Sequence, residues 1–148
     1  MSVIVTDSGF APDDWRAGFT PLEAFDADPD ERPLALDLPS DIAPEALEGR
    51  LQGIAFIRID FPAFSDGRGF SVARQLRRMG FAGRLRARGH VISDQYAMAR
   101  RSGFDEVEIS DALAERQPQA EWLSRANWAE PHYQSRLREG GLPSRRAG

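Results

Sequence analysis

The chain has 148 residues, of which 41% are hydrophobic, and this suits one globular domain that buries its own core. Its formal net charge of -4 excludes a general attraction to nucleic acid or to anionic lipid, so any anion binding must be local. Neither an apolar run of the roughly 20 residues that a membrane helix needs nor a signal-peptide pattern is present, and we expect a cytoplasmic protein.

Two residue types are missing from the sequence, and each absence removes a class of chemistry. The chain has no cysteine, which excludes disulfides, thiolate nucleophiles and cysteine-ligated iron-sulfur clusters held by this chain alone. All 19 basic residues are arginine. Without lysine there is no Schiff base, no lysine-linked pyridoxal phosphate and no phosphate-loop lysine. The sequence leaves the identity of any other cofactor unknown.

The first third of the chain predicts two kinds of structure. Residues 2–19 begin with alternating valines and a Ser-Gly turn, which predict a small strand or hairpin at the domain edge. Residues 21–33 are rich in aspartate and proline and predict a surface loop. Residues 34–38 predict a strand, and the following Pro-Ser-Asp predicts the start of a helix over 42–51.

The middle of the chain alternates between short apolar runs and amphipathic stretches. The β-branched and aromatic run 54–61 predicts a strand that Pro62 ends, and residues 71–79 have the three-residue apolar spacing of a helix that Gly80 ends. A strand over 85–92 and a helix capped by Ser93 and Asp94 are expected next.

The last third predicts a short strand at 107–109 and a helical region over 110–123 that Pro118 interrupts. We expect Trp122, Trp128 and Tyr133 to pack this region onto the body, and residues 140–148 to be disordered.

The order of these elements predicts the fold class. Strands that alternate with helices form a parallel sheet through right-handed crossovers. We therefore predict a single α/β domain over residues 1–139 with about four parallel strands. An open sheet and a half-barrel completed by a second subunit both fit this pattern, so a homo-oligomer is compatible with it.

Several polar side chains follow the predicted strands at the rim where ligands of parallel α/β sheets bind. The strand ends supply Asp37, Asp60, His90 and Glu108, and the adjoining loops supply Asp66, Arg68 and Asp94. Such a set could bind a divalent metal or transfer protons, or it could consist of helix caps and solvated strand ends. His90 alone is more typical of a structural histidine.

The segment 65–71, SDGRGFS, joins the strongest predicted strand to a helix through Gly67 and Gly69. Backbone N–H groups and the helix dipole would favour an anion there, and Arg68 could add a bidentate contact. The third glycine of a dinucleotide fingerprint and the lysine of a Walker loop are both missing. The alternative is a glycine turn in which Asp66 or Ser71 caps the helix.

Arginines recur in the next two predicted elements. Arg84, Arg86 and Arg88 alternate along a strand and would share one face, so the strand must lie at an edge or its arginines must be paired. Arg77 and Arg78 lie late in the preceding helix, where a basic pair complements the dipole and faces water.

The segment from Asp66 to Asp105 resembles a bacterial family catalogued as domain of unknown function 934. The matching motifs are Asp66-Gly67-Arg68, Ser71, Leu76-Arg77, Gly83, Leu85-Arg86-Ala87, Gly89, Asp94-Gln95 and Gly103-Phe104-Asp105. The resemblance extends from about Trp15 to Tyr133. Members are described as probable oxidoreductases of sulfite reduction because they occur beside sulfite reductase. The resemblance therefore implies a pathway association.

Three classes of function follow from the residues and the resemblance. The first is an accessory protein of assimilatory sulfite reduction that binds sulfite reductase, its electron donor or a sulfur oxyanion. The second is a small enzyme for an anionic metabolite, with Asp66 or Asp94 as the acid-base group and Arg68 with Arg86 as a clamp. The third is a scaffold protein whose arginines and aspartates pair with one another. The candidate binding residues are Gly67, Arg68, Gly69, Ser71, Arg86 and Gln95.

Overall fold

The computed structural model describes residues 2–28, 30 and 32–129, and in this part of the chain seven strands form one sheet. The strands are β1 (Ser2–Thr6), β2 (Gly9–Ala11), β3 (Thr20–Pro21), β4 (Ala35–Leu38), β5 (Phe56–Phe61), β6 (Arg84–Gly89) and β7 (Glu106–Ser110). The helices are α1 (Leu22–Ala27), α2 (Arg68–Arg78), α3 (Tyr96–Ser102), α4 (Asp111–Arg116) and α5 (Gln119–Leu123). Two 3-10 turns, η1 (Pro44–Leu47) and η2 (Ser93–Gln95), complete the elements.

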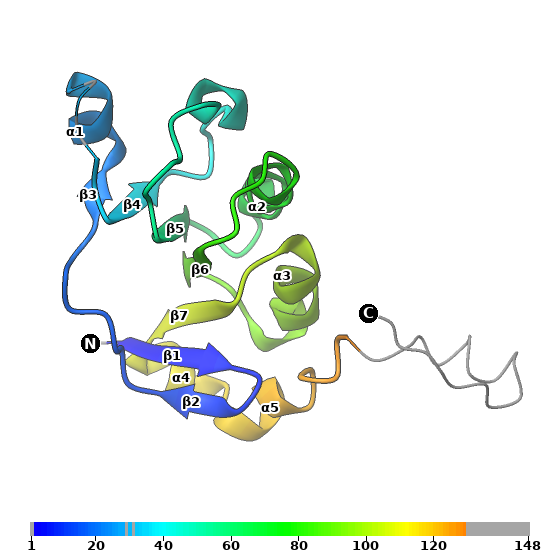
Figure 1. Cartoon of the computed structure of the whole chain (residues 1–148). Helices are drawn as coiled ribbons and strands as arrows, with labels where there is room; N and C mark the ends of the chain where they lie inside the picture. The colour runs from blue at the N-terminus through cyan, green and yellow to red at the C-terminus, as the bar shows by residue number, and fades with distance from the viewer. Residues whose placement is uncertain (1, 29, 31, 130–148) are drawn as a thin grey trace, which may run out of the picture.

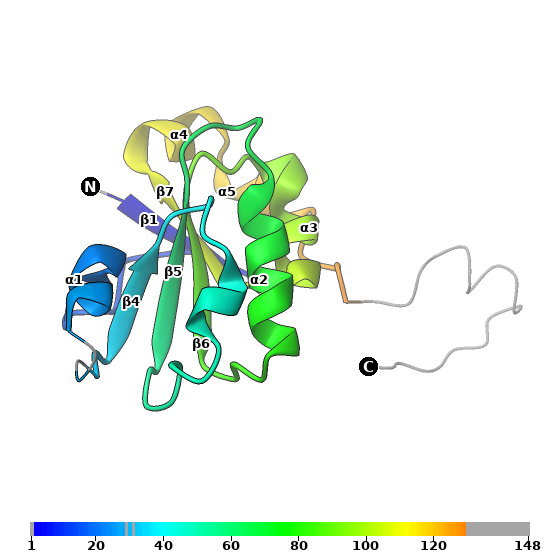
Figure 2. The same ribbon diagram turned by 90° about the horizontal axis from the view of Figure 1, so that it is seen from above.

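The sheet is open and mostly parallel, with the strand order β2-β1-β7-β6-β5-β4-β3. Strands β3 to β7 are parallel and adjacent in chain order, whereas the β1–β2 hairpin adds two antiparallel strands beside β7. Because each crossover advances in the same direction, the connecting helices α2 and α3 lie on the same face, side by side (Figures 1 and 2). The predicted α/β class is confirmed, but the sheet has more strands than the predicted four.

The core lies between this helical face and the sheet. Strand positions that face the helices are apolar, and those that face away are mostly charged, as the alternation of a β-strand requires. The buried apolar side chains facing the helices include Ile57, Ile59, Leu85, Ala87 and Val107. On α2, Val72, Ala73 and Leu76 complete the contact at helical spacing.

Two of the expected elements differ in the structure. The predicted loop over 21–33 begins at the last residue of β3 and contains the short helix α1, because Phe25 is buried against the core and overrides the polar composition around it. The predicted helix over 42–51 is only the 3-10 turn η1, in which Pro44 and Leu47 are buried and the chain then leaves through Gly49 at φ +80°.

The remaining boundaries shift by a few residues. Helix α2 begins at Arg68 rather than Ser71, and the expected helix after Ser93 is η2 followed by α3. Pro118 separates α4 from α5, as expected, and Trp122 is buried. Tyr133 and residues 140–148 lie outside the described residues. In the described part of the chain, no helix is long and apolar enough to cross a membrane.

The face opposite α2 and α3 is crossed by residues 12–19, which we call the strap. The strap connects β2 at one edge of the sheet with β3 at the other edge (Figure 1). Its aromatic side chains pack on the sheet, since Trp15 and Phe19 each lie 5.0 Å from the ring of Phe56.

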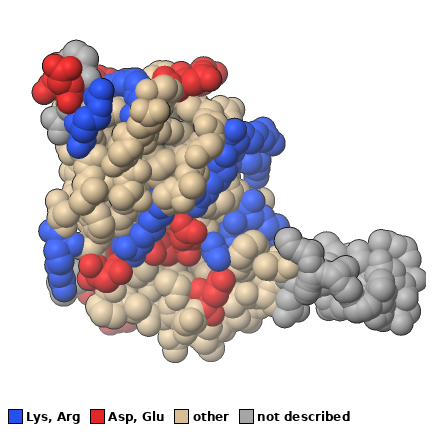
Figure 3. All heavy atoms as spheres, in the orientation of Figure 1, with Lys and Arg blue, Asp and Glu red and all other residues tan. Residues whose placement is uncertain are grey.

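Basic and acidic side chains are intermixed on the surface seen in Figure 3, so no large patch of one sign covers this view.

Candidate functional site

The turn between β5 and α2 is organised by an ion pair between Asp66 and Arg68. The guanidinium donates from Nε to Oδ1 at 2.9 Å and from Nη2 to Oδ2 at 2.7 Å, and the backbone N–H of Arg68 also donates to Oδ1. The Ser40 hydroxyl adds a contact to Oδ2 at 3.2 Å. The hydrogen bonds from Arg68 hold the pKa of Asp66 well below its usual range. Asp66 therefore stays ionised.

Gly67 and Gly69 have different roles in this turn. Gly67 stands at the start of α2 with φ -92°, a conformation open to most residues. A Cβ on Gly69 would lie 2.5 Å from the ring of Phe61, so glycine at this position allows α2 to approach the sheet closely. Of these two glycines, Gly69 is the one whose missing side chain the packing requires.

A hollow of about 270 Å³ lies beside this ion pair. Arg68, Ser71 and Gln75 follow one another on one face of α2 at i, i+3 and i+7, and they line the hollow with Ser40 and Asp41. The side chain of Arg68 is 60% exposed. Ile42, Pro44 and Val72 add apolar groups to the lining, so the predicted residues Arg68 and Ser71 share a concave surface of mixed polarity.

Asp94 and Gln95 lie in the neighbouring loop after β6. The amide of Gln95 accepts from the Ile92 N–H at 3.0 Å and donates to the Phe64 carbonyl at 3.2 Å, which joins this loop to the turn after β5. Asp94 is exposed and forms an ion pair with Arg125. Both side chains thus have partners within the described chain.

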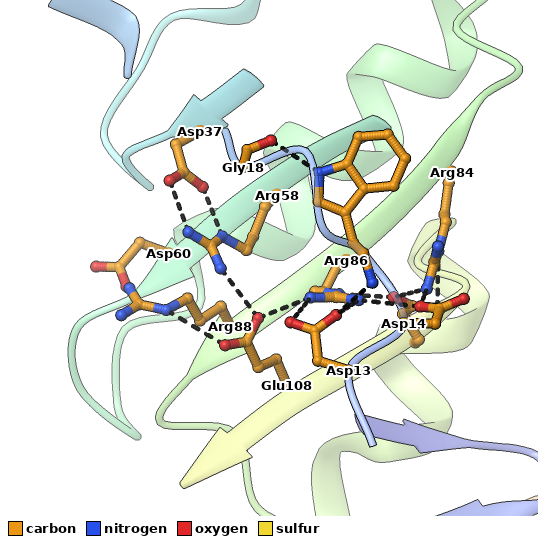
Figure 4. Close-up of polar contacts among 12 residues, drawn as sticks. Asp13, Asp14, Gly18, Asp37, Arg58, Asp60, Arg84, Arg86, Arg88 and Glu108 are labelled. Atoms are coloured by element: carbon orange, nitrogen blue, oxygen red, sulfur yellow. Dashed lines mark hydrogen bonds and ion pairs between the residues drawn. The ribbon is translucent and has the colours of Figure 1, made fainter. Parts of the chain in front are cut away.

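Arg86 occupies the centre of a buried charge network on the face under the strap (Figure 4). It donates from Nε to Glu106 at 2.6 Å, from Nη1 to Glu108 at 2.9 Å and from both Nη atoms to Asp13 of the strap at 3.1–3.2 Å. Burial opposes its charge, but the hydrogen bonds that Arg86 donates to Asp13 and Glu106 outweigh burial and raise the pKa of Arg86. Strand β6 is therefore an interior strand, and its alternating arginines are paired with carboxylates. This is the second of the two alternatives that the sequence left open.

Neighbouring arginines extend the network on both sides. Arg58 forms a bidentate pair with Asp37 at 2.6 and 2.8 Å and reaches Glu108 at 3.1 Å (Figure 4). Arg84 bonds Glu106 at 2.9 Å and Asp14 of the strap at 2.6 Å. The network therefore spans the four adjacent strands β4 to β7, and the strap binds it through the arginines of β6.

The predicted clamp of Arg68 with Arg86 is not assembled in the structure. Arg86 projects from the face under the strap, whereas α2 packs against the opposite face, where Gly69 meets Phe61. The predicted site residues therefore fall into two groups: the Arg68 turn with the Gln95 loop, and Arg86 within the charge network.

The rim at the carboxyl ends of β5 to β7 brings together side chains that the strand ends predicted. Asp60, Arg88, His90 and Glu108 line a second hollow of about 440 Å³. Arg88 was not among the residues that the strand ends predicted at this rim. Identifying it requires the side-chain alternation along β6 together with the ends of β5 and β7. In the part of the chain that is described, no group of three or more His, Asp or Glu side chains is placed to bind a metal ion.

Arg77 differs from the sequence prediction, which placed it in water. Its guanidinium donates to the carbonyl oxygens of Gly103 at 2.7 and 2.9 Å, Gly83 at 2.7 Å and Phe81 at 3.0 Å, and it also reaches Asp105. The long side chain of Arg77, near the end of α2, extends to the loops that precede β6 and β7. The prediction considered only the helix dipole and therefore missed these contacts.

Comparison with known proteins addresses the family of this chain. A family model described as "Bacterial protein of unknown function (DUF934)" matches residues 35–141. The chain belongs to this family. No curated protein and no solved structure matches it significantly.

The DUF934 match includes every candidate site residue, from Asp66 in the turn after β5 to Gln95 in the loop after β6. It begins later than the expected start near Trp15. The β1–β2 hairpin and the strap therefore lie outside the matched range, although the strap supplies the partners of Arg84 and Arg86.

Proposed function

We propose that this DUF934 protein is an accessory protein of assimilatory sulfite reduction, located in the cytoplasm, that binds a small sulfur oxyanion at the Arg68 hollow. The pathway is proposed from the family resemblance of the sequence. The binding role is supported by one observation: Arg68, held by Asp66, lines a hollow together with Ser71 and Gln75, and much of its side chain is exposed.

The ion pair leaves part of the Arg68 guanidinium available. Asp66 takes the edge formed by Nε and Nη2, so the Nη1 group lies on the side away from the carboxylate. Ser71 and Gln75 add hydroxyl and amide donors on the same helix face. An oxyanion can accept from a guanidinium and from such neutral donors together.

The same contacts give less support to an enzyme that uses Asp66 as its acid-base group. Such a group works best with a pKa near the working pH. Here the pKa of Asp66 is lowered by the Arg68 hydrogen bonds, which favours a permanent charge. Asp94 is exposed in its pair with Arg125 and has no enclosing pocket among the described hollows. A binding role needs no proton transfer, so it is compatible with an Asp66 that stays ionised beside Arg68.

Titration calorimetry with sulfite and with sulfate tests the proposal on the purified chain. We expect saturable binding that Arg68→Gln weakens roughly tenfold or more, since a hydrogen bond to a charged group contributes about 1.5–3 kcal/mol. Arg78→Gln, an exposed change in the last turn of α2, is the matched control and should bind as the unmodified chain does.

A second arm measures sulfite reductase turnover with and without the protein. Turnover that rises with the unmodified chain and not with Arg68→Gln would support the accessory role. An effect on turnover without oxyanion binding would move the proposal to a direct partner contact with the reductase or its electron donor. Absence of binding, association and effect on turnover would refute the accessory role.

A further inference from the structure

We infer that the rim hollow bordered by Asp60, Arg88 and His90 is a second ligand site, suited to a small zwitterion such as an α-amino acid. The hollow measures about 440 Å³, which lies in the range of small-molecule pockets. It opens beyond the carboxyl ends of parallel strands, where ligands of α/β sheets gather. The inference does not depend on the proposed sulfur oxyanion or on the Arg68 hollow.

Arg88 is held less tightly than the other three arginines of the network, since Arg58, Arg84 and Arg86 each have an ion pair of 2.6 Å. The Nη1 of Arg88 lies 3.3 Å from Oδ1 of Asp60, and its Nε lies 3.8 Å from Glu108 (Figure 4). Charge-assisted hydrogen bonds are ordinarily about 2.7–2.9 Å long. The two side chains are also 49% and 45% exposed, whereas Arg86 beside them is wholly buried. Separating Arg88 from Asp60 therefore sacrifices little stability.

A ligand with both charges can enter this pair without leaving either partner unsatisfied. Its ammonium group would donate to Asp60, and its anionic group would accept from Arg88. A simple anion would face Asp60 across the hollow, and a simple cation would face Arg88. Since Glu108 already accepts from Arg58 and Arg86 at 3.1 and 2.9 Å, it adds little unbalanced charge. The charge arrangement thus favours a zwitterion over a simple anion or a simple cation.

His90 is held at the edge of the hollow by the local backbone. Gly89 has φ +115°, and the N–H of Val91 donates to its carbonyl at 3.0 Å, so His90 is the centre of a tight three-residue turn. The backbone N–H of His90 donates to the Phe61 carbonyl at 2.9 Å, and its Nδ1 lies 3.2 Å from the same oxygen. With Nδ1 engaged, Nε2 is the ring atom left for a ligand.

The rest of the lining of this hollow contains smaller groups. Pro62 supplies apolar surface, which accommodates a short side chain, and Ser110 supplies a hydroxyl. The Ser110 oxygen accepts from the N–H of Leu113 at 3.1 Å, which leaves its proton as a donor toward a ligand. A small ligand with one apolar or hydroxylated substituent fits this lining.

Titration of the His90 imidazole signals by NMR tests this inference. The probes are L-serine and 2-aminoethanesulfonate, which carry different anionic groups, and their half-ligands acetate, methanesulfonate and methylammonium. We expect at least one zwitterion to shift the signals saturably and its half-ligands to bind roughly tenfold more weakly, equivalent to about 1.4 kcal/mol. His90→Asn assigns the signals, because the chain has 2 histidines.

Three variants distinguish this site from the Arg68 hollow. Arg88→Gln should abolish the zwitterion response, and Asp60→Asn should remove the preference for the zwitterion over its anionic half. Arg68→Gln should leave the response unchanged. A response that persists in Arg88→Gln, or no saturable shift with either zwitterion, would overturn the inference. Sulfite or sulfate binding that is lost only in Arg68→Gln would bear on the proposed function alone.

Discussion

Arg86 and Glu106 lie directly opposite each other on adjacent parallel strands and form a buried ion pair with Nε 2.6 Å from Oε2. Glu108 and Asp13 bind the remaining edges of the same guanidinium. A parallel sheet usually buries both faces under apolar side chains, but here one face is closed by charges and a strap. The stability of this face depends on keeping the charges matched.

Replacement of Arg86 with Met should therefore be strongly destabilising. The change leaves Glu106 and Glu108 buried without their shared cation, and breaking a buried pair in this way costs about 3–5 kcal/mol. Equilibrium unfolding in urea measures the loss. Arg88→Met is the matched control, because it alters the same strand and the same face at an exposed pair, for which we expect a loss below about 1 kcal/mol. Equal losses in the two variants would contradict the central role of Arg86.

The alternation of Arg84, Arg86 and Arg88 was enough to predict that these side chains share a face and need partners unless the strand lies at an edge. It could not identify the partners. Asp13 and Asp14 lie 73 and 70 residues before the arginines that they bind, and they reach β6 only because the strap crosses the sheet. A long-range connection of this kind leaves no local pattern in the sequence. The composition of the strap therefore did not indicate that its aspartates pair with β6.

The candidate site was predictable to a similar degree. The glycine turn predicted that a helix begins after β5, and the predicted strand ends placed Asp60, His90 and Glu108 on one rim. The sequence left the pairing of Asp66 with Arg68 as one of several alternatives, and it did not reveal that Arg68 and Arg86 project on opposite sides of the sheet. Those facts depend on side-chain geometry at the helix start and on the face to which each residue belongs.

Replacement of Gly69 with Ala should loosen the contact of α2 with the sheet. A Cβ at this position would lie 2.5 Å from Phe61, whose ring is also packed against Phe70 and Phe104. Overpacking of this kind costs about 1–3 kcal/mol. Gly67→Ala is the control, because the nearest atom to its Cβ, on Phe70, would be 3.7 Å away. Thermal unfolding compares the two, and equal midpoints would contradict the close approach.

Protonation of Asp7 should contribute to acid unfolding. Burial raises its pKa, but hydrogen bonds from Arg100, Tyr96 and Trp128 together lower that pKa below its ordinary 3.8. Because the folded state has the lower pKa, the stabilisation is complete above the unfolded value and is lost as pH falls through the folded one. Asp7→Asn should therefore be less stable near neutrality and should lose stability less steeply on acidification.

Urea unfolding across this pH range measures the difference between Asp7→Asn and the unmodified chain. Glu115→Gln, an exposed change on α4, is the control and should retain the steep acid loss. If Asp7→Asn and the unmodified chain lose stability in parallel as pH falls, the hydrogen bonds to Asp7 do not contribute to the acid transition.

Replacement of Arg77 with Lys should destabilise the chain although it preserves the charge. The guanidinium of Arg77 binds the carbonyl oxygens of Phe81, Gly83 and Gly103, which belong to the loops entering β6 and β7. A lysine ammonium has no planar fork and cannot reach all three positions at once. Loss of one such charged hydrogen bond corresponds to about 1.5–3 kcal/mol. Arg78→Lys, on the exposed side of the same helix turn, should change the free energy of unfolding by less than about 0.5 kcal/mol. Urea unfolding decides between them: equal stability of the two lysine variants would mean that Arg77 acts only as a charge at the end of α2.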